Sequence, residues 1–130
     1  MNRLSSNCIH TFRHSGKLAA EAAAGGTGEL DEGKRWVTGF QLWADAGSAG
    51  EHMPILFSGA DRDMGTGILY WAIIDNIKLT GSRTTCRYFE IREIKPARKR
   101  SEIRLRNGNR QMSDDLIRPY AICMTPSFLT

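Results

Sequence analysis

The feature that most limits the fold of this chain is an uninterrupted apolar run of seven residues, Ile68 to Ile74. A short run of this kind between turn signals is typical of a strand that is buried on both faces of a sheet. Residues 77–79 extend it beyond a kink near Asp75-Asn76, and Gly81-Ser82 reads as a turn. Thr84 to Ile91 is rich in β-formers and predicts the next strand. The sequence therefore predicts a sheet with residues 68–74 at its centre.

Further strands are predicted on both sides of this central pair. They cover residues 35–43, 53–58, 101–106 and 117–124, with a small-residue loop over 44–51 and a basic loop over 95–100. Alternation supports the first, where Trp36, Thr38, Phe40 and Leu42 share one side. A helical turn is expected at 113–116. About six short strands with one or two short helices predict an α+β domain built on a small, mostly antiparallel β-barrel.

The first 35 residues differ from the rest. Ser15 to Ala24 has high helix propensity, with Ser15 as the expected N-cap and Gly25-Gly26 as the stop. A polar loop is predicted from Gly25 to Lys34. We therefore expect residues 1–35 to be an appended segment, flexible or docked on a partner, and residues 36–130 to be the barrel domain.

The net charge of +4 is unevenly distributed. Residues 1–35 carry +1, residues 36–82 carry −3 and residues 83–130 carry +6. A basic final third indicates an anionic partner such as nucleic acid. The alternatives are a solvated basic face, neutralised by Glu90, Glu93 and Glu102, or oppositely charged surfaces of two copies that meet.

The three cysteines lie far apart and have no metal-ligand spacing. An odd number of cysteines without a secretory signal indicates reduced thiols and a cytoplasmic location. Cys86 and Cys123 lie in strand-like runs and are expected in the core. No apolar run is long enough to cross a membrane, and no cofactor motif is present.

Arginine supplies the candidate phosphate contacts. Arg87 lies on one predicted strand, and Arg104 and Arg106 lie on the next. If these strands pair, the three side chains form a basic stripe, and Arg118 adds a fourth cation on the final strand. The planar guanidinium fork suits phosphates and base edges.

Aromatic side chains supply the candidate stacking surfaces. Trp43 borders the predicted small-residue loop and is expected at a pocket mouth, while Trp71 is a core residue or a ligand contact. Tyr120 alternates with Arg118 in the last fourteen residues, where Pro119 and Pro126 bracket an apolar run. Each stacked base contributes about 1–3 kcal/mol.

Three segments together resemble the PUA-like superfamily, and within it the EVE and ASCH types. These are Met53-Pro-Ile-Leu-Phe-Ser-Gly-Ala60, Gly67-Ile-Leu-Tyr-Trp-Ala-Ile-Ile-Asp75 and the late Ile117-Arg-Pro-Tyr-Ala-Ile122 strand after a helical turn. The resemblance covers roughly residues 36–128 and rests on strand order and texture. It implies a pseudo-barrel of five or six strands and binding of RNA or a modified base. We therefore predict non-catalytic recognition of nucleic acid or a modified nucleobase.

Two other functions remain open. One is a protein-interaction module, a homodimer formed through a strand edge or through the apolar tail at residues 126–129. The other is a metal-dependent nuclease, because Asp75 and Glu93-Ile-Lys95 match the loose Asp…Glu-x-Lys pattern of two metal-holding carboxylates and an assisting lysine.

Other catalytic readings have less support. An amidohydrolase of the ASCH type would need convergence of Lys78, Thr85 and Glu90. The histidines His10, His14 and His52 are expected at the surface rather than as catalytic bases.

Overall fold

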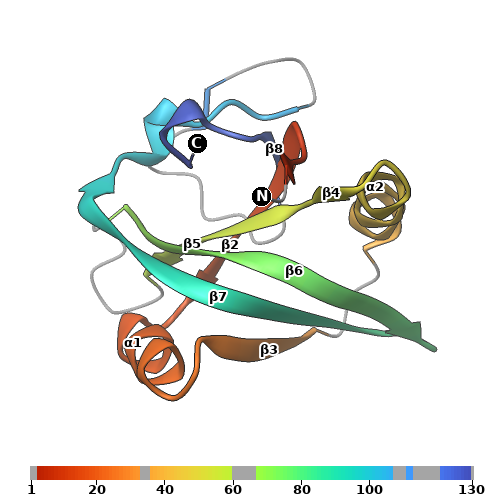
Figure 1. Ribbon diagram of the computed structural model, residues 1–130, viewed down its shortest axis with the longest axis horizontal. Coiled ribbons are helices and arrows are strands. Elements are labelled where there is room, and N and C mark those ends of the chain that lie inside the picture. Colours follow the sequence, from red (N-terminus) through yellow and green to blue (C-terminus); the bar gives the residue numbers. More distant parts are fainter. Residues whose placement is uncertain (1–2, 33–35, 60–66, 107–110, 113–120, 130) are drawn as a thin grey trace.

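The computed structural model describes residues 3–32, 36–59, 67–106, 111–112 and 121–129 as an α+β fold (Figure 1). Its main sheet contains β2 (Asn7–Arg13), β3 (Thr27–Glu32), β5 (Pro54–Gly59), β6 (Ile68–Thr80), β7 (Arg83–Arg98) and β8 (Ala121–Met124). A second, two-stranded sheet pairs β1 (Arg3–Leu4) with β4 (Glu51–His52). The helices are α1 (Ser15–Ala23), α2 (Val37–Ser48) and the 3-10 helices η2 (Arg100–Glu102) and η3 (Ser127–Leu129).

The strands of the main sheet follow the order β3-β7-β6-β5-β2-β8. All neighbours are antiparallel except β2 and β5, which run parallel with Ile9 opposite Ile55. The predicted α+β class and the mostly antiparallel pairing are therefore confirmed. Because β3 and β8 lie at the two edges of this order, the described strands do not close into a barrel.

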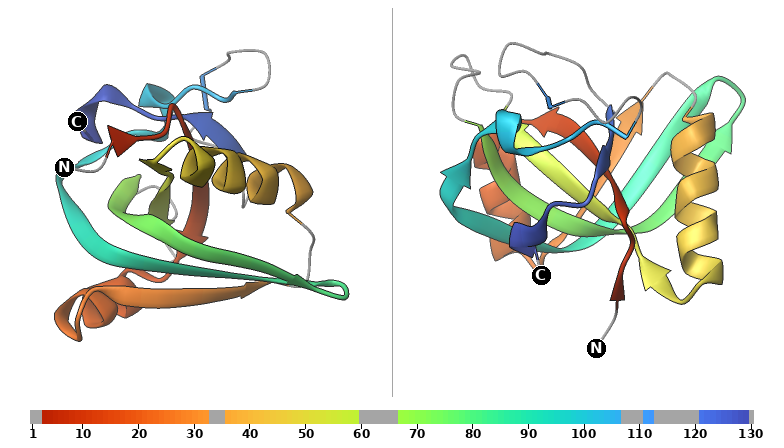
Figure 2. Two further views of the ribbon diagram at one scale, coloured as in Figure 1. Left: turned by 45° about the vertical axis from the view of Figure 1, so that its right-hand side comes forward. Right: turned by 90° about the horizontal axis from the view of Figure 1, so that it is seen from above.

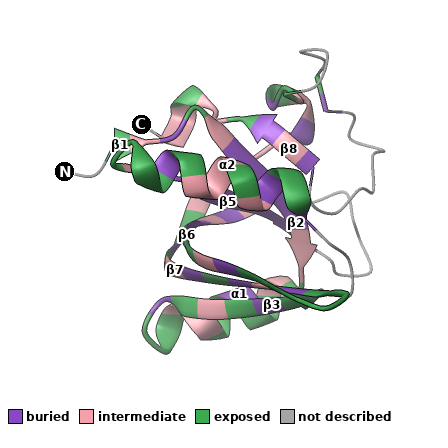
Figure 3. Cartoon of the chain, turned by 90° about the vertical axis from the view of Figure 1, so that its right-hand side faces the viewer, coloured by how far each residue is buried: buried purple, intermediate pink, exposed green. Residues whose placement is uncertain are grey.

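The predicted central strand is confirmed and is longer than expected. β6 has a paired neighbour on each side, and its register against β7 shifts between Ile74 and Asn76, where the kink was predicted. The hairpin turn uses Gly81, whose φ of 62° favours glycine. The tip of this hairpin is exposed (Figure 3). β7 continues to Arg98, so the basic loop predicted from residue 95 is mostly strand.

The strand predicted over residues 35–43, and the loop predicted after it, are wrong. Residues 37–48 form α2, which lies against β4 and β6. Trp36, Phe40 and Trp43 are spaced at about one helical turn, and Phe40 and Trp43 pack on the core. A side chain at Gly39 would meet Ile9 Cδ1 at 3.3 Å, so this glycine lets the helix approach the sheet closely.

Residues 1–35 contribute to the main sheet instead of lying beside it. β2 lies between β5 and β8, and β3 pairs with β7 from Thr27 to Glu32, where a polar loop was predicted. The sheet therefore crosses the boundary that the sequence placed at residue 35. The predicted helix is confirmed as α1, although the residue at its N-cap position is His14, one before Ser15.

An ion pair joins α1 to the sheet. Arg13 of β2 donates from Nε to Glu21 Oε1 at 2.9 Å and from Nη2 to Glu21 Oε2 at 3.1 Å. The Tyr88 hydroxyl of β7 donates to the same carboxylate at 3.2 Å. The side chains of Arg13 and Glu21 are only 12% and 17% exposed. The consecutive elements β2 and α1 thus meet the distant strand β7 at one carboxylate.

The core has a separate cluster on each face of the sheet. Ile9, Ile55 and Phe57 belong to the first cluster, whereas Cys8 and Leu56, whose side chains point the opposite way, belong to the second. Figure 2 shows α1 and β3 on one side of the β6–β7 ribbon and the C-terminal segments on the other. The predicted burial of Cys86 and Cys123 is confirmed.

After β7 the chain crosses to the far edge of the sheet. Residues 104–106, predicted within a strand from 101, make isolated bridges from Arg104 to Gln111 and from Leu105 to Cys123 of β8. Ile103 is buried, whereas Arg104 and Arg106 are exposed. The helical turn predicted at 113–116 lies outside the described residues. Neither described α-helix has the length and apolar content to span a bilayer.

Candidate nucleic-acid interface

The densest group of cations lies on residues 98–106, which we call the basic crossover. It contains Arg98, Lys99, Arg100, Arg104 and Arg106, with Glu102 as its only acidic residue. The crossover leaves β7 through η2 and then lies beside β8, where Arg106 N donates to Ile122 O at 3.0 Å and Met124 N donates to Arg104 O at 2.9 Å. The exposed cations Lys99, Arg104 and Arg106 therefore lie along the path from the end of β7 to the edge strand β8.

Glu102 stabilises the first turn of the crossover. Its Oε2 accepts a hydrogen bond from Lys99 N at 2.9 Å, and its Oε1 forms an ion pair with Arg98 Nη2 at 3.0 Å. Ile103 and Met112 are buried beneath this turn, and Met112 N donates to Ile103 O at 2.7 Å. The crossover is therefore held by packing and hydrogen bonds, which fixes the positions of its cations.

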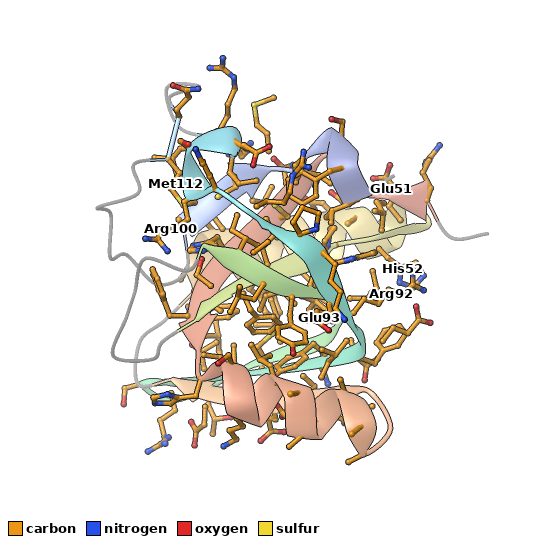
Figure 4. The ribbon with its side chains drawn as sticks, turned by 90° about the vertical axis from the view of Figure 1, so that its left-hand side faces the viewer. Glu51, His52, Arg92, Glu93, Arg100 and Met112 are labelled. Atoms are coloured by element: carbon orange, nitrogen blue, oxygen red, sulfur yellow. The ribbon has the colours of Figure 1, made fainter. Side chains whose placement is uncertain are left out.

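Arg100 packs the crossover against the Phe12 ring of β2, next to a buried polar pair. Its side chain is 3% exposed, and its Cζ lies 5.7 Å from the centre of the Phe12 ring. Beside it, His10 Nε2 of β2 and Ser58 Oγ of β5 are hydrogen-bonded at 2.7 Å. The rings of His10 and Phe12 meet edge to face at 5.1 Å. In Figure 4, Arg100 and Met112 lie at one end of this face, away from His52 and Arg92.

His10 is neutral in this environment. Burial, and then the charge of Arg100, lower its pKa from the usual 6.5 to about 3. The histidine and serine together resemble a nucleophile and its base. However, both side chains are fully buried, and a general base works best with a pKa near the operating pH. The burial and the low pKa of His10 favour a structural role for this pair over a hydrolytic one.

The prediction that His10 lies at the surface is therefore wrong. Its segment, Asn7 to Arg13, contains the β-formers Ile9, Thr11 and Phe12, which are the signal that indicates a strand. Core clusters cover both faces of the sheet at β2, so Cys8, Ile9 and His10 are all buried. Arg100 was likewise missed as a buried residue, because arginine is rarely buried without contacts that only the fold supplies.

The cations of β7 are already paired with carboxylates. The pairs are Arg83 with Asp31 at 2.6 Å, Arg87 with Asp75 at 3.7 Å, Arg92 with Glu90 at 3.2 Å and Lys95 with Glu93 at 3.3 Å. β7 therefore forms a neutralised basic face, which was one of the alternatives that the sequence predicted. In contrast, the side chains of Lys99 and Arg106 are exposed and make no ion pair with any described residue.

The expected stripe of Arg87, Arg104 and Arg106 does not form. β7, which carries Arg87, pairs with β3 and β6, whereas residues 104–106 lie beyond β8 at the opposite edge of the sheet. Arg104 and Arg106 remain together on the crossover. Arg118 and Tyr120 lie outside the described residues.

Two arginines stack on aromatic rings of the same face. Arg92 Cζ lies 5.3 Å from the ring centre of Trp71, which is half-buried and packs on the second core cluster. Arg98 Cζ lies 4.7 Å from the ring centre of Phe128 in η3. Trp43 is not beside a loop, because it packs from α2 with Phe40 against the first cluster. Of the two tryptophans predicted to contact ligand, Trp71 thus lies beside an arginine, whereas Trp43 packs on the core.

The carboxylates of the nuclease pattern lie apart. Glu93 is opposite Tyr70, and Asp75 follows five residues later on β6, which corresponds to roughly 15 Å along the strand. Within the described part of the chain, no three His, Cys, Asp or Glu side chains are grouped so as to hold a metal ion. Of the amidohydrolase set, Lys78 and Thr85 are cross-strand partners, but Glu90 lies five residues further along β7.

The apolar tail that was considered for dimerisation packs within the chain. Phe128 and Leu129 are partly buried against the second core cluster.

No protein-family model matches this sequence, and no curated protein is significantly similar to it.

Proposed function

We propose that this protein binds single-stranded nucleic acid without cleaving it. One observation carries the proposal: the cations of β7 are matched with carboxylates, while Lys99 and Arg106 on the basic crossover are exposed and make no ion pair with a described residue. Phosphates are the partners that such cations recognise, and release of counterions supplies much of the affinity. The crossover therefore binds the phosphate backbone, with Arg104 beside Arg106 as a further contact.

Bases would lie on the neighbouring Arg–aromatic stacks. Single-stranded nucleic acids are commonly recognised when unstacked bases lie against aromatic rings or guanidinium planes. Trp71 with Arg92 offers a surface of this kind, and the guanidinium plane of Arg98, on which Phe128 lies, offers another. A modified nucleobase within a strand is accommodated by the same contacts.

We propose further that the fold is a PUA-like pseudo-barrel. Two observations support this. β2 and β5 form a parallel pair within an otherwise antiparallel sheet, and the crossover brings the chain from β7 to the opposite edge beside β8. The resemblance of residues 36–128 to that superfamily, whose members commonly bind RNA or modified bases, agrees with the proposed ligand.

The test compares two pairs of arginines. Arg104→Gln with Arg106→Gln removes charge from the crossover, and Arg83→Gln with Arg87→Gln removes the same charge from carboxylate-paired positions on β7. Binding of labelled single-stranded RNA and DNA is measured by fluorescence anisotropy between about 50 and 200 mM salt.

The crossover variant should bind more weakly, and its log Kd should depend less on log salt, by about 1.4 if both phosphate contacts are lost. The β7 variant should resemble the wild type. Equal losses in the two variants, or binding that does not respond to salt, would contradict the proposal. Magnesium-dependent cleavage would favour the nuclease, and absence of binding to any oligonucleotide would favour a protein partner.

A further inference from the structure

The C-terminal tail folds back onto the face that carries the proposed ligand surface. After β8, Thr125 N donates to Ser6 O at 2.9 Å, and η3 then places Phe128 and Leu129 on the second core cluster. Trp71 packs on the same cluster. The tail is thus held near the basic crossover by the packing of two side chains.

Phe128 occupies one face of Arg98. The guanidinium carbon lies 4.7 Å from the ring centre, and Nη2 pairs with Glu102 at 3.0 Å. The Nε atom of Arg98 is buried and makes no hydrogen bond within the described part of the chain. A buried donor without an acceptor is costly, and the Phe128 ring offers only its weakly accepting π face.

A nucleotide of a bound strand would satisfy this arginine better than phenylalanine does. Its base has a flat π face that stacks on the guanidinium, as Phe128 does, and its sugar and phosphate oxygens accept hydrogen bonds. The exchange keeps the stacking contact and lets Nε donate, in the plane of the guanidinium, to an oxygen of the strand's backbone. Because Arg98 begins the basic crossover, a base at this position lies next to the backbone phosphates bound there.

We infer that Phe128 occupies, in the free protein, a base-stacking position on Arg98, and that a base of the bound single strand displaces it. This inference rests on the proposed nucleic-acid binding. It assigns Arg98 as a base contact and the tail at residues 126–129 as an internal competitor of the ligand. Binding is therefore weaker by the free energy of the Arg98–Phe128 contact.

The experiment weakens the Arg98–Phe128 contact in one variant and strengthens it in another. Phe128→Leu keeps an apolar side chain but removes the aromatic ring, and Phe128→Trp supplies the ring that binds cations best. Leu129→Ala is the matched control, since Leu129 packs on the same cluster with no arginine stacked on it in the described structure. Affinities for a short labelled single-stranded RNA of mixed sequence are measured on the full chain, with thermal unfolding as a check on folding.

Phe128→Leu should bind about two- to fivefold more tightly than the wild type, which corresponds to loss of a partly exposed cation–π contact. Phe128→Trp should bind more weakly, and Leu129→Ala should change affinity little. A change of the same sign in both Phe128 variants, or unchanged affinity in Phe128→Leu, would overturn the inference while salt-dependent wild-type binding still supported the proposed function. If no variant binds, both proposals fail.

Discussion

Replacing His10 by glutamine tests the buried polar pair of His10 and Ser58 beside Arg100. In the folded protein, burial and the charge of Arg100 lower the pKa of His10 to about 3, whereas the usual value is 6.5. Between these two pH values the unfolded chain binds a proton that the folded protein does not. Stability from the neutral imidazole is therefore complete above pH 6.5 and is lost as the pH falls toward 3.

The size of the effect follows from the two pKa values. At pH 5 the unfolded imidazole is protonated and the folded one is not, so the loss is 1.5 pH units at 1.36 kcal/mol each, or about 2 kcal/mol. This figure depends little on the folded pKa, because pH 5 lies well above it. Glutamine does not titrate, and its amide can still donate to the Ser58 hydroxyl, which His10 contacts at 2.7 Å.

The assay is urea unfolding at pH 7 and pH 5. From pH 7 to pH 5 the free energy of unfolding should fall by about 2 kcal/mol more in the wild type than in His10→Gln. His14→Gln, at an exposed histidine, serves as the control and should follow the wild type. Equal pH dependence in the wild type and in His10→Gln would refute the assignment of a buried, neutral histidine.

Two further predictions each compare a pair of substitutions, the first at two glycines and the second at two ion pairs. Gly28→Ala should destabilise the protein by about 1–3 kcal/mol, because the new methyl group would lie 2.6 Å from the Tyr88 ring. Gly47 lies on an exposed helical turn, where no atom lies within 4 Å of an added Cβ, so Gly47→Ala should instead stabilise the protein by about 0.5–1 kcal/mol. Thermal unfolding measures both variants, and melting temperatures that shift in the same direction would contradict this prediction. Glu21→Gln leaves the partly buried Arg13 without its charged partner and should cost about 1–3 kcal/mol in urea unfolding. Asp31→Asn, at an exposed pair, should cost under about 1 kcal/mol, and a cost equal to that of Glu21→Gln would argue against the burial difference.

Local signals were sufficient where sequence neighbours decide the structure. The helix at 15–23 ends just before Gly25 and Gly26, both with positive φ, where the glycine pair predicted a stop. Local signals failed for α2, because its aromatic residues and Val37 favour a strand by propensity. There the contact of Gly39 with Ile9 and the packing of Phe40 and Trp43 on the core outweigh propensity.

The candidate site was predictable only in part, for a similar reason. The sequence located the basic segment and named Arg104, Arg106 and Trp71, because composition and alternation are local properties. It placed Arg87 with them wrongly, since pairing between distant strands depends on the register of the whole sheet. Whether a cation meets a carboxylate, as Arg87 meets Asp75, likewise depends on cross-strand contacts that residue order does not specify.

The sequence by itself determined the α+β class, the central strand β6 and the concentration of positive charge in the last third of the chain. Apolar runs, turn residues and charge counts carry this information because each acts over a few residues. Only the tertiary structure decided that β2 is an inner strand, that His10 and Arg100 are buried together, and that Phe128 lies on Arg98. These features join residues far apart in the chain, and their energies arise from burial and contact that exist only after the sheet has formed.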